Sequence, residues 1–370
     1  MGSNYKWNKK EVLTEYLKSI KNVIKTRGKD LSYRNDNANL SDMLRVLFNE
    51  PLYRLHILSV LEFKGDLLRD SDFFNEHLTD FQRKNIEKII RNVLEENFYI
   101  YSIESEFDNK NINYIDKLLE FLNEINPLLS NELKSVINNN RLYIDSKNKN
   151  TQYSGSCFTA NNKNYYQIIP DKITNVFMTL NHENVHGLTN ILSNRKFDND
   201  KSIILYRELG SILIELYSNQ YLFNNDLISE EEYIYNYNYI YLCNLYSNIE
   251  LLDFLYRLSK LDTNKSKRNI RKLIDVEVKE KPNYDFGLYE LNELPLEHHL
   301  TYLYSSSVAI ALFNMFKDNP KSGMDAAIDI MLNVNKENEE ELFKKYNINI
   351  CNSLDIYKKE NNRLIKKKRC

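Results

Sequence analysis

The sequence contains one short motif whose residue types and spacing suit metal chemistry. His182, Glu183 and His186 form the pattern His-Glu-x-x-His. On an α-helix, two imidazoles four residues apart project from one face, so both can bind a single metal ion. Zn²⁺ accepts nitrogen ligands at about 2.0–2.1 Å, and a glutamate beside the first histidine can serve as general base toward a metal-activated water. The motif therefore predicts a zinc site with His182 and His186 as ligands and Glu183 as the base.

The segment around the motif has the pattern of an amphipathic helix over residues 173–192. Asp171, behind Pro170, is suited to cap its start. Apolar side chains at three- and four-residue steps form a stripe on a different face from the histidines. Two packed histidines without a metal are the competing interpretation. The stripe that we expect in the core is Ile173, Val176, Phe177, Leu180, Leu188 and Ile191.

A catalytic zinc site needs a third protein ligand and one open position. The extended motif with a third histidine is excluded, because Thr189 and Leu192 stand where it requires Gly and His. A helix predicted over residues 202–223 offers Glu208 and Glu215, seven residues apart and hence on one face, about 10 Å apart along the axis. Only one of them can bind the ion directly. We expect Glu208 to be the third ligand and Glu215 to be an acceptor that orients a histidine.

The rest of the chain is predicted to be mainly helical. Between residues 141 and 170, short apolar runs alternate with polar turns at Gly155 and Asn161-Asn162, which predicts a small β-sheet. We therefore expect a helical, zincin-like fold with a small sheet next to the metal-binding helix. Its expected parts are a helical N-terminal region, 1–140, and a catalytic region, 141–370. Helical periodicity covers residues 8–27, 40–48, 81–101, 115–125, 132–138, 173–192, 202–223, 230–260, 300–316 and 324–332.

The composition excludes several other classes of protein. Only 8 Gly and 6 Pro occur in 370 residues, too few for turn-rich sandwiches or propellers, and neither GxGxxG nor a P-loop motif is present. A net charge of -2 provides no field that would attract nucleic acid or an anionic membrane. No apolar run approaches the length of a membrane span, and the first residues lack the apolar core of a signal peptide. We expect a cytoplasmic protein whose 4 cysteines are reduced.

Further segments around the motif carry a family resemblance. They are residues 155–158 (Gly-Ser-Cys-Phe), 166–169 (Tyr-Gln-Ile-Ile), 175–183, and Glu208-Leu209-Gly210-Ser211 with Glu215 seven positions after Glu208. Together they resemble the segment leading into the active helix, and the Glu-x-x-Ser segment, of the oligoendopeptidase F and thimet oligopeptidase family of zinc peptidases. The resemblance implies that Glu208 completes the zinc site.

A segment near the C-terminus extends this resemblance. Residues 302–309, Tyr-Leu-Tyr-Ser-Ser-Ser-Val-Ala, resemble the family's Tyr-x-Tyr segment, which lies in the cleft and supplies phenol groups to the transition state. An oxyanion that forms beside a metal needs hydrogen-bond donors. The resemblance implies that Tyr304, together with Tyr302 or His299, donates to it. Of the adjacent His298 and His299, His299 is the preferred candidate.

The sequence also departs from the family pattern. Val185 stands where the family usually has Gly, and Ser307 stands where it often has Gly. The spacing from His299 to Tyr304 is shorter than usual, and the N-terminal region is much shorter than in full-length members.

The leading hypothesis is a zinc-dependent endopeptidase that hydrolyses short peptides through a metal-activated water. The alternative, motivated by the departures, is a catalytically degenerate peptide-binding or regulatory protein that retains the peptidase scaffold. A helical interaction module with an accidental motif is a third hypothesis. The expected cofactor is Zn²⁺ and the expected partner is a peptide substrate, with no nucleic acid and no membrane. The sequence does not decide the oligomeric state.

Overall fold

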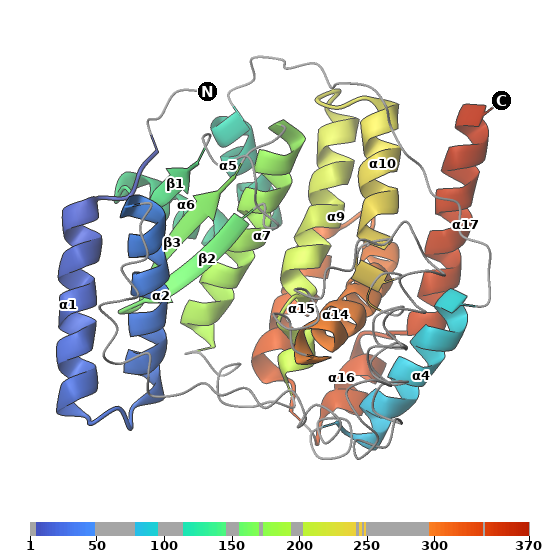
Figure 1. Ribbon diagram of the computed structural model, residues 1–370. Helices are drawn as coiled ribbons and strands as arrows, with labels where there is room; N and C mark the ends of the chain where they lie inside the picture. The colour runs from blue at the N-terminus through green and yellow to red at the C-terminus, as the bar shows by residue number, and fades with distance from the viewer. Residues whose placement is uncertain are drawn as a thin grey trace, which may run out of the picture.

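The computed structural model describes residues 5–48, 78–94, 114–145, 155–169, 173–193, 203–241, 244–245, 248, 296–335 and 337–369. Within these ranges the chain is mainly helical with a small β-sheet, as the sequence predicts (Figure 1). The helices of the first part are α1 (Lys9–Lys25), α2 (Leu31–Phe48), α4 (Asp80–Leu94), α5 (Tyr114–Ile125) and α6 (Pro127–Asn138). Those that follow are α7 (Ile173–Leu192), the 3₁₀ helix η3 (Ile204–Tyr206), α9 (Leu209–Asn224), α10 (Glu230–Tyr241), α14 (Leu296–Met315), α15 (Pro320–Asn333), α16 (Glu339–Lys345) and α17 (Ile350–Arg369).

The sheet has three strands, β1 (Leu142–Ile144), β2 (Gly155–Ala160) and β3 (Lys163–Ile168), in the order β1-β3-β2. β1 pairs with β3 in parallel, and β2 pairs with β3 antiparallel. Asn161 and Asn162 join β2 to β3 with φ values of 51° and 58°. A two-residue hairpin turn of this kind needs positive φ at both positions, which Asn tolerates better than most residues. The predicted sheet and its Asn-Asn turn are both confirmed.

The two faces of the sheet pack against different helices. Successive strand residues point to opposite faces, so the neighbours Tyr165 and Tyr166 lie in different hydrophobic clusters. Tyr165 joins a small cluster with residues of α1 and α2, centred on Trp7. Tyr166 joins the main core, and its hydroxyl hydrogen-bonds to Asn184 of α7. The sheet therefore separates the α1–α2 pair from the helices that follow, as Figure 1 shows.

The main core is continuous along most of the described chain. It contains Leu118 and Leu133 from before residue 140 together with Leu180, Leu300 and Ile365 from after it. The division at residue 140 stays a prediction. Among the described residues, no helix is both long and apolar enough to cross a membrane.

Two sequence expectations need correction, and others fall outside the described residues. The predicted helix over residues 202–223 is wrong at its start, because η3 and a turn precede α9, which begins at Leu209. In the predicted core stripe of α7, Val176, Phe177, Leu180 and Leu188 are buried, but Ile191 is 42% exposed because the last turn of the helix extends past the core. The proposed cap at Asp171, the Ile173 side chain, residues 95–101 and most of 242–260 lie outside the described residues.

Asn184 fixes α7 against two other elements. Its side-chain amide donates to the backbone carbonyl of Leu129 on α6 at 2.9 Å. Its side-chain oxygen accepts from the hydroxyl of Tyr166 on β3 at 3.2 Å. All three residues are buried. If the amide were removed, the carbonyl of Leu129 and the hydroxyl of Tyr166 would each lose a hydrogen bond with no water to replace it.

We predict that Asn184→Ala destabilises the protein by about 2–4 kcal/mol, because two buried polar groups lose their partner and a small cavity forms. Urea unfolding measures the change in the free energy of unfolding. Asn225→Ala is the matched control, because that amide makes only an exposed bond to the carbonyl of Tyr221. Equal stability of the two variants would refute the anchoring role of Asn184.

Candidate metal centre

α7 presents His182 and His186 on one face while its other side is packed. The side chain of Val185, between them in the sequence, is buried in the main core. A Cβ atom added at Gly210 of α9 would lie 2.9 Å from Cγ1 of Val185, so Val185 fills the contact between α7 and α9. The departure from the family's Gly at this position therefore falls in the core and not beside the imidazoles.

Glu208 reaches the histidines from the turn before α9. Its backbone has φ −94° and ψ −3°, close to helical values, and its carbonyl accepts from the amide of Ile212 at 2.9 Å. The glutamate thus stands at the N-cap position of α9 and not within the helix. The residue is 7% exposed. Ser211, in the first turn of α9, donates to the carbonyl of His182 at 3.1 Å and ties the two helices together at this point.

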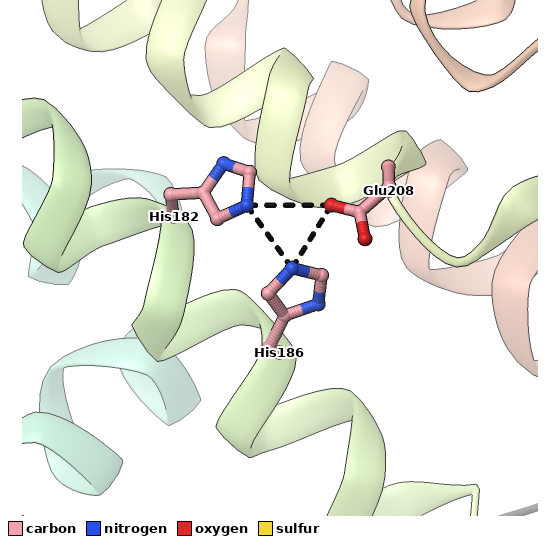
Figure 2. Close-up of side chains that lie close together, drawn as sticks. All are labelled: His182, His186 and Glu208. Atoms are coloured by element: carbon pink, nitrogen blue, oxygen red, sulfur yellow. Dashed lines mark hydrogen bonds and ion pairs between the residues drawn. The ribbon is translucent and has the colours of Figure 1, made fainter. Parts of the chain in front are cut away.

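Three potential ligand atoms form a small triangle (Figure 2). Nε2 of His182 lies 3.0 Å from Nε2 of His186. Oε2 of Glu208 lies 3.3 Å from Nε2 of His182 and 3.0 Å from Nε2 of His186. A tetrahedral ion with ligands at about 2.0–2.1 Å requires ligand atoms about 3.3 Å apart. The triangle therefore has nearly the dimensions of one face of a zinc coordination tetrahedron.

The hydrogen bonding of this triangle also fits a metal ion. Oε2 of Glu208 is buried and has no hydrogen-bond partner, although both imidazoles are close to it. A buried carboxylate oxygen without a donor is costly unless a cation compensates it. The donor set, two imidazoles and one carboxylate, is one that zinc accepts in catalytic sites. The residues present can therefore hold a divalent cation.

Glu215 orients the first histidine. Its Oε1 lies 2.7 Å from Nδ1 of His182. A carboxylate can only accept, so Nδ1 carries a proton, and in the neutral ring Nε2 keeps the lone pair that a metal ligand needs. Burial lowers the pKa of His182, but Glu215 and Glu208 outweigh this effect and raise the pKa well above its usual value. Burial acts to raise the pKa of Glu208, but the two imidazoles hold it well below its ordinary value.

Glu183 lies beside the triangle in a tight place. A Cβ atom on Gly155 of β2 would lie 2.9 Å from Oε1 of Glu183 and would clash with Cγ2 of Thr179. Only glycine leaves room at this point of the strand for the glutamate side chain. Burial raises the pKa of Glu183, partly opposed by His182 and His186. The carboxyl group thus binds a proton more readily than an exposed glutamate, as a group that takes up and returns a proton must.

One face of α14 adds two polar rings near the triangle. His298 and Tyr302 are one helical turn apart, and their ring centroids are separated by 4.6 Å. The charge of Glu208 is the main cause that raises the pKa of Tyr302, ahead of burial. Burial lowers the pKa of His298, and Glu208 opposes this. Both rings therefore lie close enough to Glu208 to interact with its charge.

The structure places the hydroxyl of Tyr304 among other partners. Its hydroxyl donates to Oε1 of Glu339 at 3.1 Å, and it accepts from the side-chain amide of Asn85 at 3.3 Å. Residues two apart on a helix are about 200° apart around the axis, so Tyr302 and Tyr304 point to nearly opposite sides of α14. Of the predicted pair, Tyr302 is the one near the triangle.

His298 and His299 have different neighbours on α14. Nδ1 of His299 is 2.8 Å from Oδ1 of Asn248. Burial, with a smaller effect from His298, lowers the pKa of His299 to about 4. His298 is the histidine that interacts with Glu208. The four-residue spacing from His298 to Tyr302 places both side chains on one face of α14.

Known proteins resemble this chain in structure and not in sequence. No protein-family model matches the sequence, and no curated protein matches it. Among solved structures, a protein assigned as oligoendopeptidase F from Bacillus anthracis str. Ames is similar with a TM-score of 0.52 and 11% identity, over 93% of this chain and 64% of that one. The chain has the fold of oligoendopeptidase F. The family resemblance predicted from the sequence is thereby confirmed at the level of the fold.

Two further structures are similar over the same extent. A second structure, also assigned as oligoendopeptidase F, is similar with a TM-score of 0.52 and 13% identity, over 90% of this chain and 64% of that one. A structure of Pz peptidase A with an inhibitor gives a TM-score of 0.50 with 14% identity, over 90% of this chain and 65% of that one. The chain thus spans about two thirds of the length of these peptidases.

The buried neutral state of His299 predicts a loss of stability in acid. An unfolded histidine titrates near 6.5, whereas the folded-state pKa is about 4. Between these values the unfolded chain binds more protons at this position, so the free energy of unfolding decreases as pH falls from about 6.5 to about 4, by up to about 3 kcal/mol.

Urea unfolding of metal-free wild type and His299→Phe across this pH range measures the effect. The other titrating groups are common to both proteins, so the difference between their stabilities isolates His299. We expect this difference to shrink as the pH falls. A difference that is constant from pH 7.5 to pH 4 would contradict the prediction.

Proposed function

We propose that the protein is a zinc-dependent endopeptidase that hydrolyses short peptides. The single observation that carries this proposal is the buried triangle of His182, His186 and Glu208 with the carboxyl group of Glu183 beside it. The fold of oligoendopeptidase F and Pz peptidase A supports it. The chain covers 64% and 65% of the length of those two proteins, at 11% and 14% identity.

Zn²⁺ bound at the triangle would supply a Lewis acid that lowers the pKa of a bound water. The protein residues have distinct roles around it. His182, His186 and Glu208 hold the ion, and Glu215 keeps His182 in the binding tautomer. Glu183 accepts the proton of the attacking water and returns it to the leaving amine. Its buried position and raised pKa suit both steps.

Side chains of α14 stabilise the oxyanion in this proposal. Attack on a peptide carbonyl places negative charge on its oxygen, which needs donors already in position. We assign this role to the hydroxyl of Tyr302, assisted by the ring of His298. A phenol is protonated at neutral pH and can donate, and burial of Tyr302 favours this form.

The alternative is a catalytically degenerate protein that has the same metal centre but does not cleave peptides. Its first argument, Val185, loses weight because that side chain lies in the core between α7 and α9. The absence of Tyr304 from the site remains an argument in its favour. Glu183 argues against it, because a structural zinc site has no need of a base beside an open ligand position.

We predict that Glu183→Gln abolishes cleavage while zinc binding is retained. Loss of a general base lowers the rate by about 10²–10⁴-fold. The measurement is cleavage of a broad library of short peptides, with zinc content determined by elemental analysis. Glu120→Gln, on an exposed position of α5, is the control and should cleave like wild type.

The outcomes separate the hypotheses. Wild type and Glu183→Gln that both hold zinc and both fail to cleave any peptide would support the degenerate alternative. Wild type without stoichiometric zinc would support the interaction module with an accidental motif.

We predict that Tyr302→Phe lowers kcat by about 10²–10³-fold with little change in zinc affinity, because removal of one oxyanion donor has an effect of this size. Steady-state kinetics on a cleaved library peptide measures it. Tyr221→Phe is the control, since that ring packs against Phe121 and Phe177 and takes no part in the site. Equal kcat values for the two variants would remove Tyr302 from the mechanism.

A further inference from the structure

Glu339, at the start of α16, is a buried carboxylate that the proposed chemistry does not use. It is 2% exposed and accepts four hydrogen bonds. The hydroxyl of Thr79 donates to Oε2 at 3.2 Å, and the amide of Gln82 donates to Oε1 at 3.1 Å. The phenols of Tyr206 and Tyr304 also donate to Oε1, the latter at 3.1 Å. One carboxylate thus connects the start of α4, η3 and α14.

The two phenols stand close in sequence to residues of the metal centre. Tyr206 ends η3, two residues before Glu208. Tyr304 follows Tyr302 by two residues on α14 and points to the other side of that helix. The rings of Tyr206 and Tyr304 pack edge to face with centroids 5.5 Å apart. Glu339 therefore holds the two segments that deliver Glu208 and Tyr302.

The backbone of η3 is held by the same helix. The hydroxyl of Thr301 donates to the carbonyl of Ile204 at 3.3 Å, and the hydroxyl of Ser305 donates to the carbonyl of Leu205 at 2.6 Å. A three-residue 3₁₀ helix has little stability of its own. The position of Glu208 thus depends on side-chain bonds from α14 and α16, whereas His182 and His186 are placed by a regular helix.

We propose that Glu339 is a positioning residue of the metal centre, which holds η3 against α14 through Tyr206 and Tyr304 so that Glu208 meets His182 and His186. The inference rests on the proposed metal site and deepens it. A carboxylate is suited to this place because it only accepts, and all four neighbouring groups donate. Glutamine would turn an amide donor toward these donors and leave at least one of them without a partner.

The test compares zinc affinity with stability. Zinc dissociation constants are measured by competition with a chromophoric chelator, and melting temperatures are measured on the metal-free proteins. We expect Glu339→Gln and Tyr206→Phe each to bind zinc about 10-fold more weakly than wild type, the lower end of the effect seen when groups that orient metal ligands are removed. The absorption spectrum of the Co²⁺-loaded variants should also differ from that of wild type, because the ligand geometry has changed.

Tyr357→Phe is the matched control. Tyr357 is fully buried, and its hydroxyl donates to the carbonyl of Tyr237 at 2.8 Å, between α17 and α10. This variant loses a buried phenol bond like Tyr206→Phe, and we expect a lower melting temperature with an unchanged zinc dissociation constant.

Zinc affinity equal to wild type in folded Glu339→Gln and Tyr206→Phe, with only the melting temperature lowered, would overturn the inference. If Glu339→Gln does not fold, Tyr206→Phe decides alone. Wild type that takes up no zinc would overturn the inference together with the metal site. Cleavage is no part of this test, so a protein that binds zinc without turnover refutes only the proposed activity.

Discussion

The site depends on three atoms that bear lone pairs and meet in a buried place. Two imidazole nitrogens and a carboxylate oxygen lie 3.0–3.3 Å from one another, and the carboxylate oxygen has no hydrogen-bond donor. Atoms of this kind repel one another at such distances unless a proton or a cation lies between them. A divalent ion satisfies all three at once, and its preferred ligand distances match the size of the triangle. The surrounding elements act mainly to keep these atoms together.

The structure holds the three ligands in two different ways. His182 and His186 are one turn apart on α7, and the helix fixes their spacing through its backbone hydrogen bonds. Glu208 lies in a turn, and side-chain bonds from α14 and the carboxylate of Glu339 hold the segment before it. The helical pair is therefore a local feature of the chain. The third ligand depends on contacts between elements far apart in the sequence.

Burial sets the protonation of the groups around the triangle. The two imidazoles hold the pKa of Glu208 well below its ordinary value, and Glu215 keeps His182 in the tautomer that presents Nε2. For Glu183 burial outweighs the opposing effect of the imidazoles and raises the pKa, and its side chain lies in a confined space next to Gly155. Neighbouring carboxyl groups with such different environments are suited to different tasks, one as a ligand and one as a proton carrier. This contrast supports hydrolysis more strongly than a metal-binding role alone.

The sequence alone determined the features that depend on local periodicity. The helix that carries His182 and His186, the Asn161-Asn162 hairpin and the choice of Glu208 and Glu215 all follow from residue types at short spacings. Only the tertiary structure decided which face of α14 meets the site. That helix is buried on nearly all sides, with His298 and His299 adjacent and Tyr302 and Tyr304 two apart, so no amphipathic pattern distinguishes its faces. The same holds for Glu339, whose partners are brought together from distant segments by packing and leave no short-range signal in the sequence.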